Sequence, residues 1–242
     1  MRLVLFDIDG TLLSAGGSGR RAINAAFEEL FGWSVPDGYW FDGKTDRQIV
    51  RELMRSEGHD DAGIDDRMDA VLARYLEFLA EALIDPAHPP RLYPGVAALL
   101  EGLEARDDVV VGLLTGNVQP GAHAKLSAVG LDPARFVIGA FGSDHERRPE
   151  LPHVAQRRAR ETLGLDVAGR AIVVIGDTPD DIACGRGIGA TAIAVATGRF
   201  SPAELEAHAP SVVFPDLADT EQVIAAIMGD TRAGIRRAGA DA

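Results

Sequence analysis

Cysteine and long apolar runs are scarce in this chain of 242 residues. Its single cysteine, Cys184, excludes an intrachain disulfide framework and fits a reducing compartment. No apolar run approaches the roughly 18 residues that a membrane span needs, and the N-terminus has no basic region followed by a small-residue cleavage site. These absences predict a cytoplasmic protein that does not bind a membrane.

Positive charge is also in short supply. The 24 Lys and Arg residues face 37 Asp and Glu residues, which leaves a formal net charge of −13, and Lys44 and Lys125 are the only lysines. Nucleic acids and anionic membranes need clustered basic residues, so neither is an expected partner. A small anionic substrate is compatible with this charge where a metal ion neutralises the acids around it.

The sequence does contain a repeated alternation of strand-like and helix-like segments. A hydrophobic fraction of 46% and a charged fraction of 25% are typical of a globular chain, and the length fits one large domain or one domain with an inserted module. Short apolar runs that suit buried parallel strands occur at 2–6, 109–114, 136–141, 171–176 and 191–196, with a weaker one at 211–214. Helical spacing occurs at 94–106, 119–130, 151–164 and 180–188. This alternation predicts an α/β fold with a doubly wound parallel sheet.

A long helical stretch separates the first predicted strand from the second. It has no comparable apolar run, and helices are expected at roughly 17–32, 45–57 and 63–85. The sequence thus predicts a helical module at 15–89, inserted into a core formed by 1–14 and 90–230. The last residues, 231–242, are small and polar with no apolar face, which predicts a loosely held tail.

The loop after the first predicted strand carries two acids, Asp7 and Asp9, followed by Gly10. In extended chain, residues two apart point to the same side, so both carboxylates can face one site, and a glycine lets the backbone turn close to a ligand. Open α/β sheets bind ligands at strand ends of this kind. An acidic turn that caps the next helix is the plainer alternative.

A second acidic loop follows the predicted strand at 171–176. It places Asp177, Asp180 and Asp181 within five residues. These carboxylates would repel one another unless a cation or solvent lies between them, and oxygen-only ligands suit Mg²⁺. Asp177 or Thr178 could at the same time cap a helix whose first residue is Pro179.

Two further loops offer groups that suit an anion. Thr115 provides a hydroxyl and Asn117 an amide, and the helix that follows them has free N–H groups at its start. Arg147 and Arg148 supply positive charge ahead of the helix at 151–164. Either loop taken alone is also ordinary turn or surface chemistry.

The order of these features resembles the haloacid dehalogenase superfamily. The shared features are strand-DIDGT, strand-LLTGN, a cation before a helix and strand-GDTPDD, with a helical insert after the first strand. The resemblance covers 1–228 and is strongest to the phosphoglycolate-phosphatase-like branch with a helical cap. It implies a Rossmann-like core with strand order 5-4-1-2-3. It also implies a Mg²⁺-dependent phosphatase, a monomer or homodimer, that hydrolyses a small phosphorylated metabolite through an aspartyl phosphate.

The resemblance assigns catalytic and metal-binding roles by position. It makes Asp7 the nucleophile and Asp9 the general acid and base. It also implies that Asp7, the backbone carbonyl of Asp9 and Asp177 bind Mg²⁺, while Asp181 supports the waters of the metal. A phosphate dianion repels a carboxylate nucleophile, and a metal that bridges the two offsets this repulsion.

For the phosphate itself, the matching positions are Thr115, Gly116, Asn117 and Arg148. The family usually has a lysine where Arg148 stands. Arginine can make a bidentate contact to phosphate and does not lose its proton, so it can stabilise the same charge with a different geometry. Lys125 is not assigned this role, because it lies too early, inside the helix that follows LLTGN.

Substrate recognition is expected from the inserted module. In the segment 42–47 a glycine turn leads into a helix capped by Thr45 or Asp46, and Lys44, Thr45 and Arg47 are the candidate recognition residues. Simple helix capping with solvated charges is the alternative.

Three other functions compete with phosphatase activity. A dehalogenase on the same fold needs no leaving-group acid and no Mg²⁺, so Asp9, Asp177 and Asp181 argue against it. A phosphomutase would share all four loops and differ in the acceptor of the phosphoryl group. A non-enzymatic binding or regulatory module would keep the pocket and lack turnover because of Arg148.

Overall fold

The computed structural model describes residues 1–230 of the chain, so the tail predicted at 231–242 lies outside the described residues. Six parallel strands form the central sheet, in the order β5-β4-β1-β6-β7-β8. The strands are β1 (Arg2–Phe6), β4 (Val109–Thr115), β5 (Ile138–Phe141), β6 (Ile172–Gly176), β7 (Thr191–Val195) and β8 (Val212–Phe214). If these six strands are numbered 1 to 6 along the chain, the sheet reads 6-5-4-1-2-3 from the β8 edge. The first five strands therefore have the predicted order 5-4-1-2-3, and β8 adds a sixth strand at one edge.

Both faces of the sheet are buried, which explains the uninterrupted apolar runs of its strands. Within β1, Leu3 and Leu5 belong to the apolar cluster that contains α6, whereas Val4 and Phe6 belong to the cluster that contains α4 and α9. The helices outside the insert are α4 (Val96–Glu104), α5 (Gln119–Ala128), α6 (Leu151–Leu163), α7 (Pro179–Cys184), α8 (Pro202–Glu206) and α9 (Thr220–Met228). The doubly wound α/β fold is therefore confirmed.

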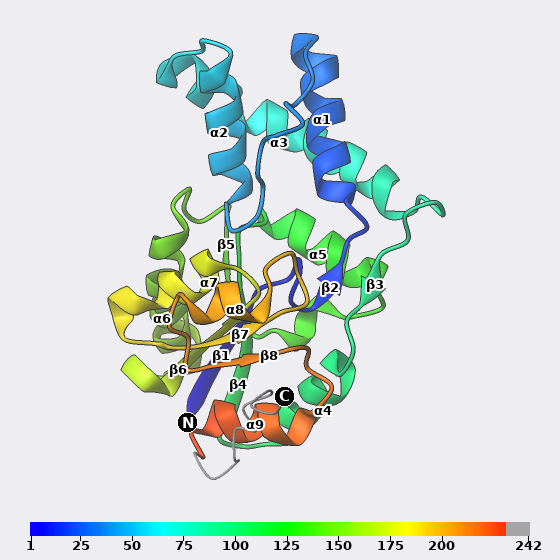
Figure 1. Cartoon of the computed structure of the whole chain (residues 1–242). Helices are drawn as coiled ribbons and strands as arrows, with labels where there is room; N and C mark the ends of the chain where they lie inside the picture. The colour runs from blue at the N-terminus through cyan, green and yellow to red at the C-terminus, as the bar shows by residue number, and fades with distance from the viewer. Residues whose placement is uncertain (231–242) are drawn as a thin grey trace.

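The segment between β1 and β4 forms a helical insert. Its helices are α1 (Ser18–Phe31), α2 (Asp46–Ser56) and α3 (Asp61–Leu83), each within two residues of the predicted bounds. Figure 1 shows α1, α2 and α3 together at one end of the molecule, beyond the sheet, while α4 and α9 lie at the opposite end. The apolar cluster that covers one face of the sheet continues into the insert through residues such as Phe27, Leu53 and Tyr75.

Two short strands, β2 (Leu13–Ser14) and β3 (Arg91–Leu92), pair in antiparallel fashion. They bring together the two ends of the insert, but they were not predicted because two residues are too few to show an alternating pattern. The predicted helix at 180–188 is in fact α7 followed by a 3₁₀ turn at Gly185–Ile188. Among the described residues, no helix combines the length and the apolar character that crossing a membrane requires.

Candidate active site

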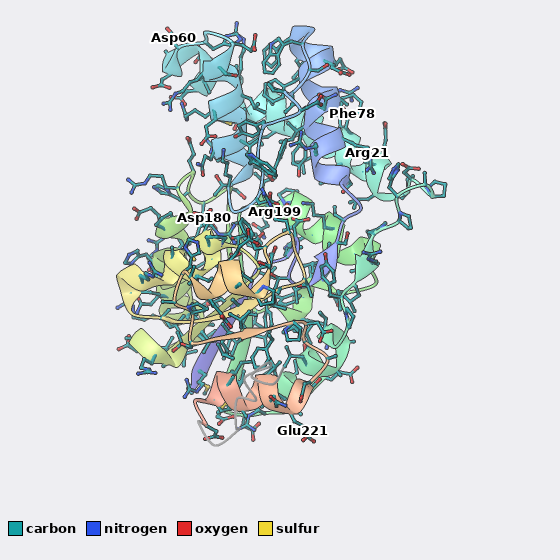
Figure 2. All side chains as sticks on the ribbon, in the orientation of Figure 1. Arg21, Asp60, Phe78, Asp180, Arg199 and Glu221 are labelled. Atoms are coloured by element: carbon teal, nitrogen blue, oxygen red, sulfur yellow. The ribbon has the colours of Figure 1, made fainter. Side chains whose placement is uncertain are left out.

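A cavity of about 640 Å³ lies between the carboxyl ends of the strands and the insert. Figure 2 shows Arg199, one of the lining residues, at the level where the insert meets the sheet, whereas Glu221 lies at the far end of the molecule. Among the lining residues are predicted site residues from all four loops and one from the insert: Asp7, Asp9, Lys44, Thr115, Gly116, Asn117, Arg148 and Asp177. The structure thus brings together residues that lie up to 170 positions apart in the sequence.

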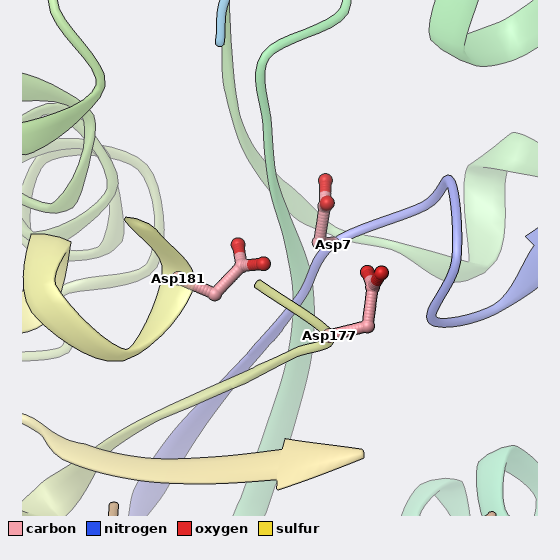
Figure 3. A group of neighbouring side chains, drawn as sticks. All are labelled: Asp7, Asp177 and Asp181. Atoms are coloured by element: carbon pink, nitrogen blue, oxygen red, sulfur yellow. The ribbon is translucent and has the colours of Figure 1, made fainter. Parts of the chain in front are cut away.

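Three buried carboxylates form a cluster, and two of them, Asp7 and Asp177, line this cavity. One oxygen from each of Asp7, Asp177 and Asp181 lies within 4.8 Å of the others, and the residues are only 5%, 4% and 1% exposed. Figure 3 shows them on the loop after β1, on the loop after β6 and in the first turn of α7. The cluster is a candidate metal site built from oxygen donors alone.

The parallel register of the sheet explains why these loops meet. Phe6, the last residue of β1, pairs with Ile175 in β6, so the two strands end level and Asp7 and Asp177 follow at the same edge. Asp7 continues the ladder by donating its backbone N–H to the carbonyl of Ile175 at 2.9 Å. At Gly10, with φ of +83°, a Cβ atom would lie 2.2 Å from Oδ2 of Asp177. Only glycine lets the first loop pass this close to that carboxylate.

Helix α7 fixes the third carboxylate. The side chain of Thr178 accepts a hydrogen bond from the backbone N–H of Asp181 at 3.2 Å, and Asp181 Oδ2 accepts one from the N–H of Thr178 at 3.0 Å. This reciprocal capping box, with Pro179 at the first helical position, confirms the predicted helix start. Asp181 therefore both caps the helix and directs its other oxygen, Oδ1, to Arg148.

Burial makes the cluster electrostatically unfavourable, and the charge of Arg148 offsets this only in part. Desolvation raises the pKa of Asp7 to about 6, an effect that Arg148 opposes and the nearby Asp181 and Asp9 reinforce. Desolvation also raises the pKa of Asp177 well above its usual range, and the charges of Asp181 and Asp7 add to this. A hard divalent cation that accepts oxygen ligands fits this donor set, because it would stabilise the ionised form of all three acids.

Arg148 is the buried cation that faces the cluster. Its Nη2 donates to Asp181 Oδ1 and lies 3.3 Å from Asp7 Oδ2, and its Nη1 donates to the carbonyl of Gly43 in the insert at 3.3 Å. Arg148 is 4% exposed, and its Nε has no hydrogen-bond partner within residues 1–230. The preceding Arg147, in contrast, has a side chain that is 73% exposed. Of the two arginines in this loop, Arg148 is the one beside Asp7.

Asp9 has a different environment from Asp7. Its Oδ2 accepts hydrogen bonds from Asn117 Nδ2 at 2.8 Å and from Lys125 Nζ at 2.6 Å. Lys125 thus lies in the site at Asp9, not at the position beside Asp7 that Arg148 occupies, and the sequence had not indicated this contact. Helix α5 follows the Thr115 loop and packs beneath the insert. Lys125 lies on the buried face of this helix, with Ala122 and Leu126, and lines the cavity.

The Thr115 loop is held by hydrogen bonds within the site and from the insert. Thr115 is fully buried, and its hydroxyl accepts a bond from Asn117 Nδ2 at 2.8 Å. The backbone N–H of Asp46 donates to the carbonyl of Gly116, and Asp46 Oδ2 accepts from the N–H of Val118, both at 2.8 Å. Asp46 of the insert thus provides one side-chain acceptor at the start of α5, and Ser143 Oγ, which accepts from the N–H of Gln119 at 2.8 Å, provides another.

The three candidate recognition residues of the insert have different positions. Lys44 lines the cavity, but its Nζ is bonded to Glu52 Oε2 at 2.5 Å. Thr45 is fully buried as the N-cap of α2, and its hydroxyl donates to the carbonyl of Glu146. Arg47 is not among the cavity-lining residues and lies 3.9 Å from Asp69.

Sequence reasoning missed several residues of the cavity because they lie outside the motifs. Arg20 and Tyr75 of the insert line it, as does Arg199 of the loop after β7. Arg20 lies in the first turn of α1, and the glycine pair at 16–17 before that helix was the one local signal that the chain turns there. Arg199 stacks on Trp40, with its guanidinium carbon 3.6 Å from the ring centroid.

Comparison with known proteins identifies the class to which this fold and site belong. The family model for haloacid dehalogenase-like hydrolases matches residues 4–186, which include all four loops. The chain therefore belongs to the haloacid dehalogenase-like hydrolase family and is a hydrolase of that family.

Two relatives and one solved structure show how similar this chain is to individual proteins. A phosphoglycolate phosphatase from Rhodospirillum rubrum is 30% identical over 225 residues, which cover 90% of this chain and 88% of the relative. An N-acetylmuramic acid 6-phosphate phosphatase from Pseudomonas putida is 27% identical over 202 residues, which cover 84% and 86%. The crystal structure of CbbY from Rhodobacter sphaeroides in complex with phosphate has a TM-score of 0.67 at 22% identity, covering 90% of this chain and 96% of that one. This last likeness shows the shared fold.

Proposed function

We propose that this protein is a Mg²⁺-dependent phosphatase that hydrolyses a small phosphorylated metabolite through an aspartyl phosphate on Asp7. The observation that carries the proposal is that two acids of one loop have different environments. Asp7 lies in the acidic cluster beside Arg148, whereas Asp9 lies outside the cluster and is bonded to Asn117 and Lys125. A nucleophile that binds metal and a separate acid and base need these two environments.

The chemistry proceeds in two steps. The Asp7 carboxylate attacks phosphorus, the bond to the leaving oxygen breaks, and Asp9 gives that oxygen a proton. Asp9 then takes a proton from water, whose oxygen attacks the phosphorus of the aspartyl phosphate and releases Asp7. Held by Asp7, Asp177 and the backbone carbonyl of Asp9, with Asp181 behind them, Mg²⁺ would supply the positive charge that offsets repulsion between carboxylate and phosphate.

Arg148 and the Thr115 loop are proposed to hold the phosphoryl oxygens. Arg148 lies 3.3 Å from the Asp7 oxygen, so a phosphate attacked by Asp7 comes within reach of its guanidinium. Thr115, Gly116 and Asn117 line the same cavity. The insert, proposed as a cap at 15–89, closes this cavity with Gly43 and Asp46, whose hydrogen bonds reach Arg148 and the Thr115 loop.

The shape and charge of the cavity support a small substrate with a second anionic group. A volume of about 640 Å³ suits a metabolite rather than a macromolecule. Of the cations that line it, Arg20 is the one without a carboxylate within 4.0 Å in the described part of the chain. Its guanidinium donates to the carbonyl of Tyr39 and lies over the ring of Phe41, which leaves further N–H donors for a ligand.

A phosphate-release screen tests the proposal. Purified protein is incubated with phosphosugars, phosphorylated short acids and nucleoside monophosphates, with Mg²⁺ or with excess EDTA. We expect release in the Mg²⁺ arm alone, and none from Asp7→Asn, which removes the nucleophile's charge but little volume. Equal release by folded Asp7→Asn would refute the mechanism. Turnover of a sugar phosphate that requires a bisphosphate activator and releases no phosphate would show a mutase instead.

A further inference from the structure

Lys125 is a buried ammonium group bonded to the proposed acid and base. The residue is 4% exposed, and its Nζ donates to Asp9 Oδ2 and to Asn117 Oδ1, each at 2.6 Å. Asn117 Nδ2 donates to the same oxygen of Asp9 at 2.8 Å. Asp9 Oδ2 therefore receives two donors, one from the loop after β4 and one from α5, and the two donors are bonded to each other.

The other oxygen of Asp9, Oδ1, is available for proton transfer. Oδ1 receives no hydrogen bond from any residue in 1–230, the Asp9 side chain is 40% exposed, and it lines the cavity. A carboxylate held at one oxygen by two donors keeps its rotation about χ1 and χ2 fixed, so the direction of the second oxygen is fixed as well.

We propose that Lys125 is a positioning residue for Asp9, an inference that rests on the proposed function. Together with Asn117 it holds Oδ2 so that Oδ1 faces the reacting oxygens. In the first step the electron pair of the broken P–O bond goes to the leaving oxygen, which receives the proton carried by Oδ1. In the second, Oδ1 takes a proton from water as the water oxygen bonds to phosphorus and the bond to Asp7 breaks.

The surroundings of Lys125 favour positioning over a surface ion pair. A buried ammonium pays a desolvation penalty that an exposed pair does not, so its contacts must be well placed to offset it. Gly19 of the insert also lies beside Nζ, since a Cβ atom there would be in van der Waals contact with it at 3.5 Å. A compact ammonium with three donors suits this space, and two of the three donors are already committed to Asp9 and Asn117.

The test compares two leaving groups in wild type and in Lys125→Met, which keeps length but removes the charge. The substrates are an alkyl phosphate that the wild type hydrolyses and 4-nitrophenyl phosphate. kcat/KM is measured because it reports steps up to departure of the leaving group. We expect a loss of about 100-fold for the alkyl phosphate, the cost of displacing a reacting group by about 1 Å. For nitrophenolate, which departs without a proton, the loss is about tenfold or less.

Lys44→Met is the matched comparison, because Lys44 lines the same cavity but is bonded to Glu52 rather than Asp9. Because a recognition residue acts on binding, Lys44→Met is compared at saturating substrate, where it should change kcat by the same factor for both substrates. The inhibition constant of inorganic phosphate should be the same for Lys125→Met and wild type. Equal losses on both substrates for Lys125→Met, or a weakened inhibition by phosphate, would overturn the positioning role.

A crystal structure of Lys125→Met separates this inference from the proposed function. We expect Asp9 to leave its position while Asp7, Asp177 and Asp181 keep theirs. An unmoved Asp9 carboxylate overturns the inference whatever the kinetics show. If the wild type releases no phosphate from any substrate, the proposed function fails, and the displacement of Asp9 in this structure alone decides whether Lys125 positions it.

Discussion

Asp46 offers a test of the electrostatics at the junction between insert and sheet. Burial raises its pKa from 3.8 to about 6, against the opposing charge of Lys125 and the hydrogen bond from Val118. The folded protein thus favours the protonated acid, and this contribution to stability is complete below about pH 4 and is lost as the pH rises to about 6. At 1.36 kcal/mol per pKa unit, ionised Asp46 costs about 3 kcal/mol at neutral pH.

Asp46→Asn keeps the shape and the acceptor for Val118 without the charge. We expect it to raise the free energy of unfolding by about 1–3 kcal/mol at pH 7.5, since the amide is a weaker acceptor than a carboxylate, and to leave it nearly unchanged at pH 4.5. In a chain of this size that corresponds to a rise in Tm of about 2–12 °C at pH 7.5. Urea unfolding from pH 4.5 to 7.5 measures the difference in free energy of unfolding between the two proteins. Every sample contains EDTA, so that the acid cluster is free of metal in both.

Asp46→Ala is the control for the hydrogen bond. It removes both the charge and the acceptor, so the buried N–H of Val118 loses its partner and the gain at pH 7.5 is offset by about 1–3 kcal/mol. Unfolding free energies of wild type and Asp46→Asn that run parallel from pH 4.5 to 7.5 would refute the reasoning, because the other acids with raised pKa are common to both proteins.

Three further predictions concern the metal and phosphate sites. Gly10→Ala should weaken Mg²⁺ binding, measured by calorimetry, by about 10-fold or more, since its Cβ would meet Asp177; unchanged affinity would contradict the close approach. In EDTA, Arg148→Ala should lower the free energy of unfolding by about 3–5 kcal/mol, because it leaves buried acids without a cation. With Mg²⁺ present, Arg148→Lys should retain more turnover than Arg148→Ala. Replacement of the exposed Arg147 by Ala is the control, and a greater loss of turnover in Arg147→Ala would place the phosphate contact at Arg147. Ca²⁺ should inhibit at fixed Mg²⁺, because its looser coordination misplaces the Asp7 carboxylate, and full activity with Ca²⁺ alone would speak against that.

Local sequence was sufficient for the strands of the sheet and for the helices of the insert. Parallel strands buried on both faces have continuous apolar runs, and loops that follow adjacent strands meet at one edge of the sheet. The strand order that the family resemblance implies makes the strands at 2–6 and 171–176 neighbours, and on that basis Asp7 and Asp177 were expected side by side. The helices of the insert could be bounded within two residues from their own pattern.

The contacts of Lys125 and of the insert could not be derived in the same way. Lys125 meets Asp9 across 116 positions of sequence because α5 packs under the insert, and Lys44 turns to Glu52 within the insert. Side chains on helices reach partners that depend on how the helices pack, and this packing depends on apolar contacts spread over both segments. Sequence by itself therefore determined which loops supply the acids, because each of these loops follows an apolar run that local patterns reveal. Only the tertiary structure decided which cation holds Asp9 and which residues line the cavity, because those contacts depend on the docking of one element against another.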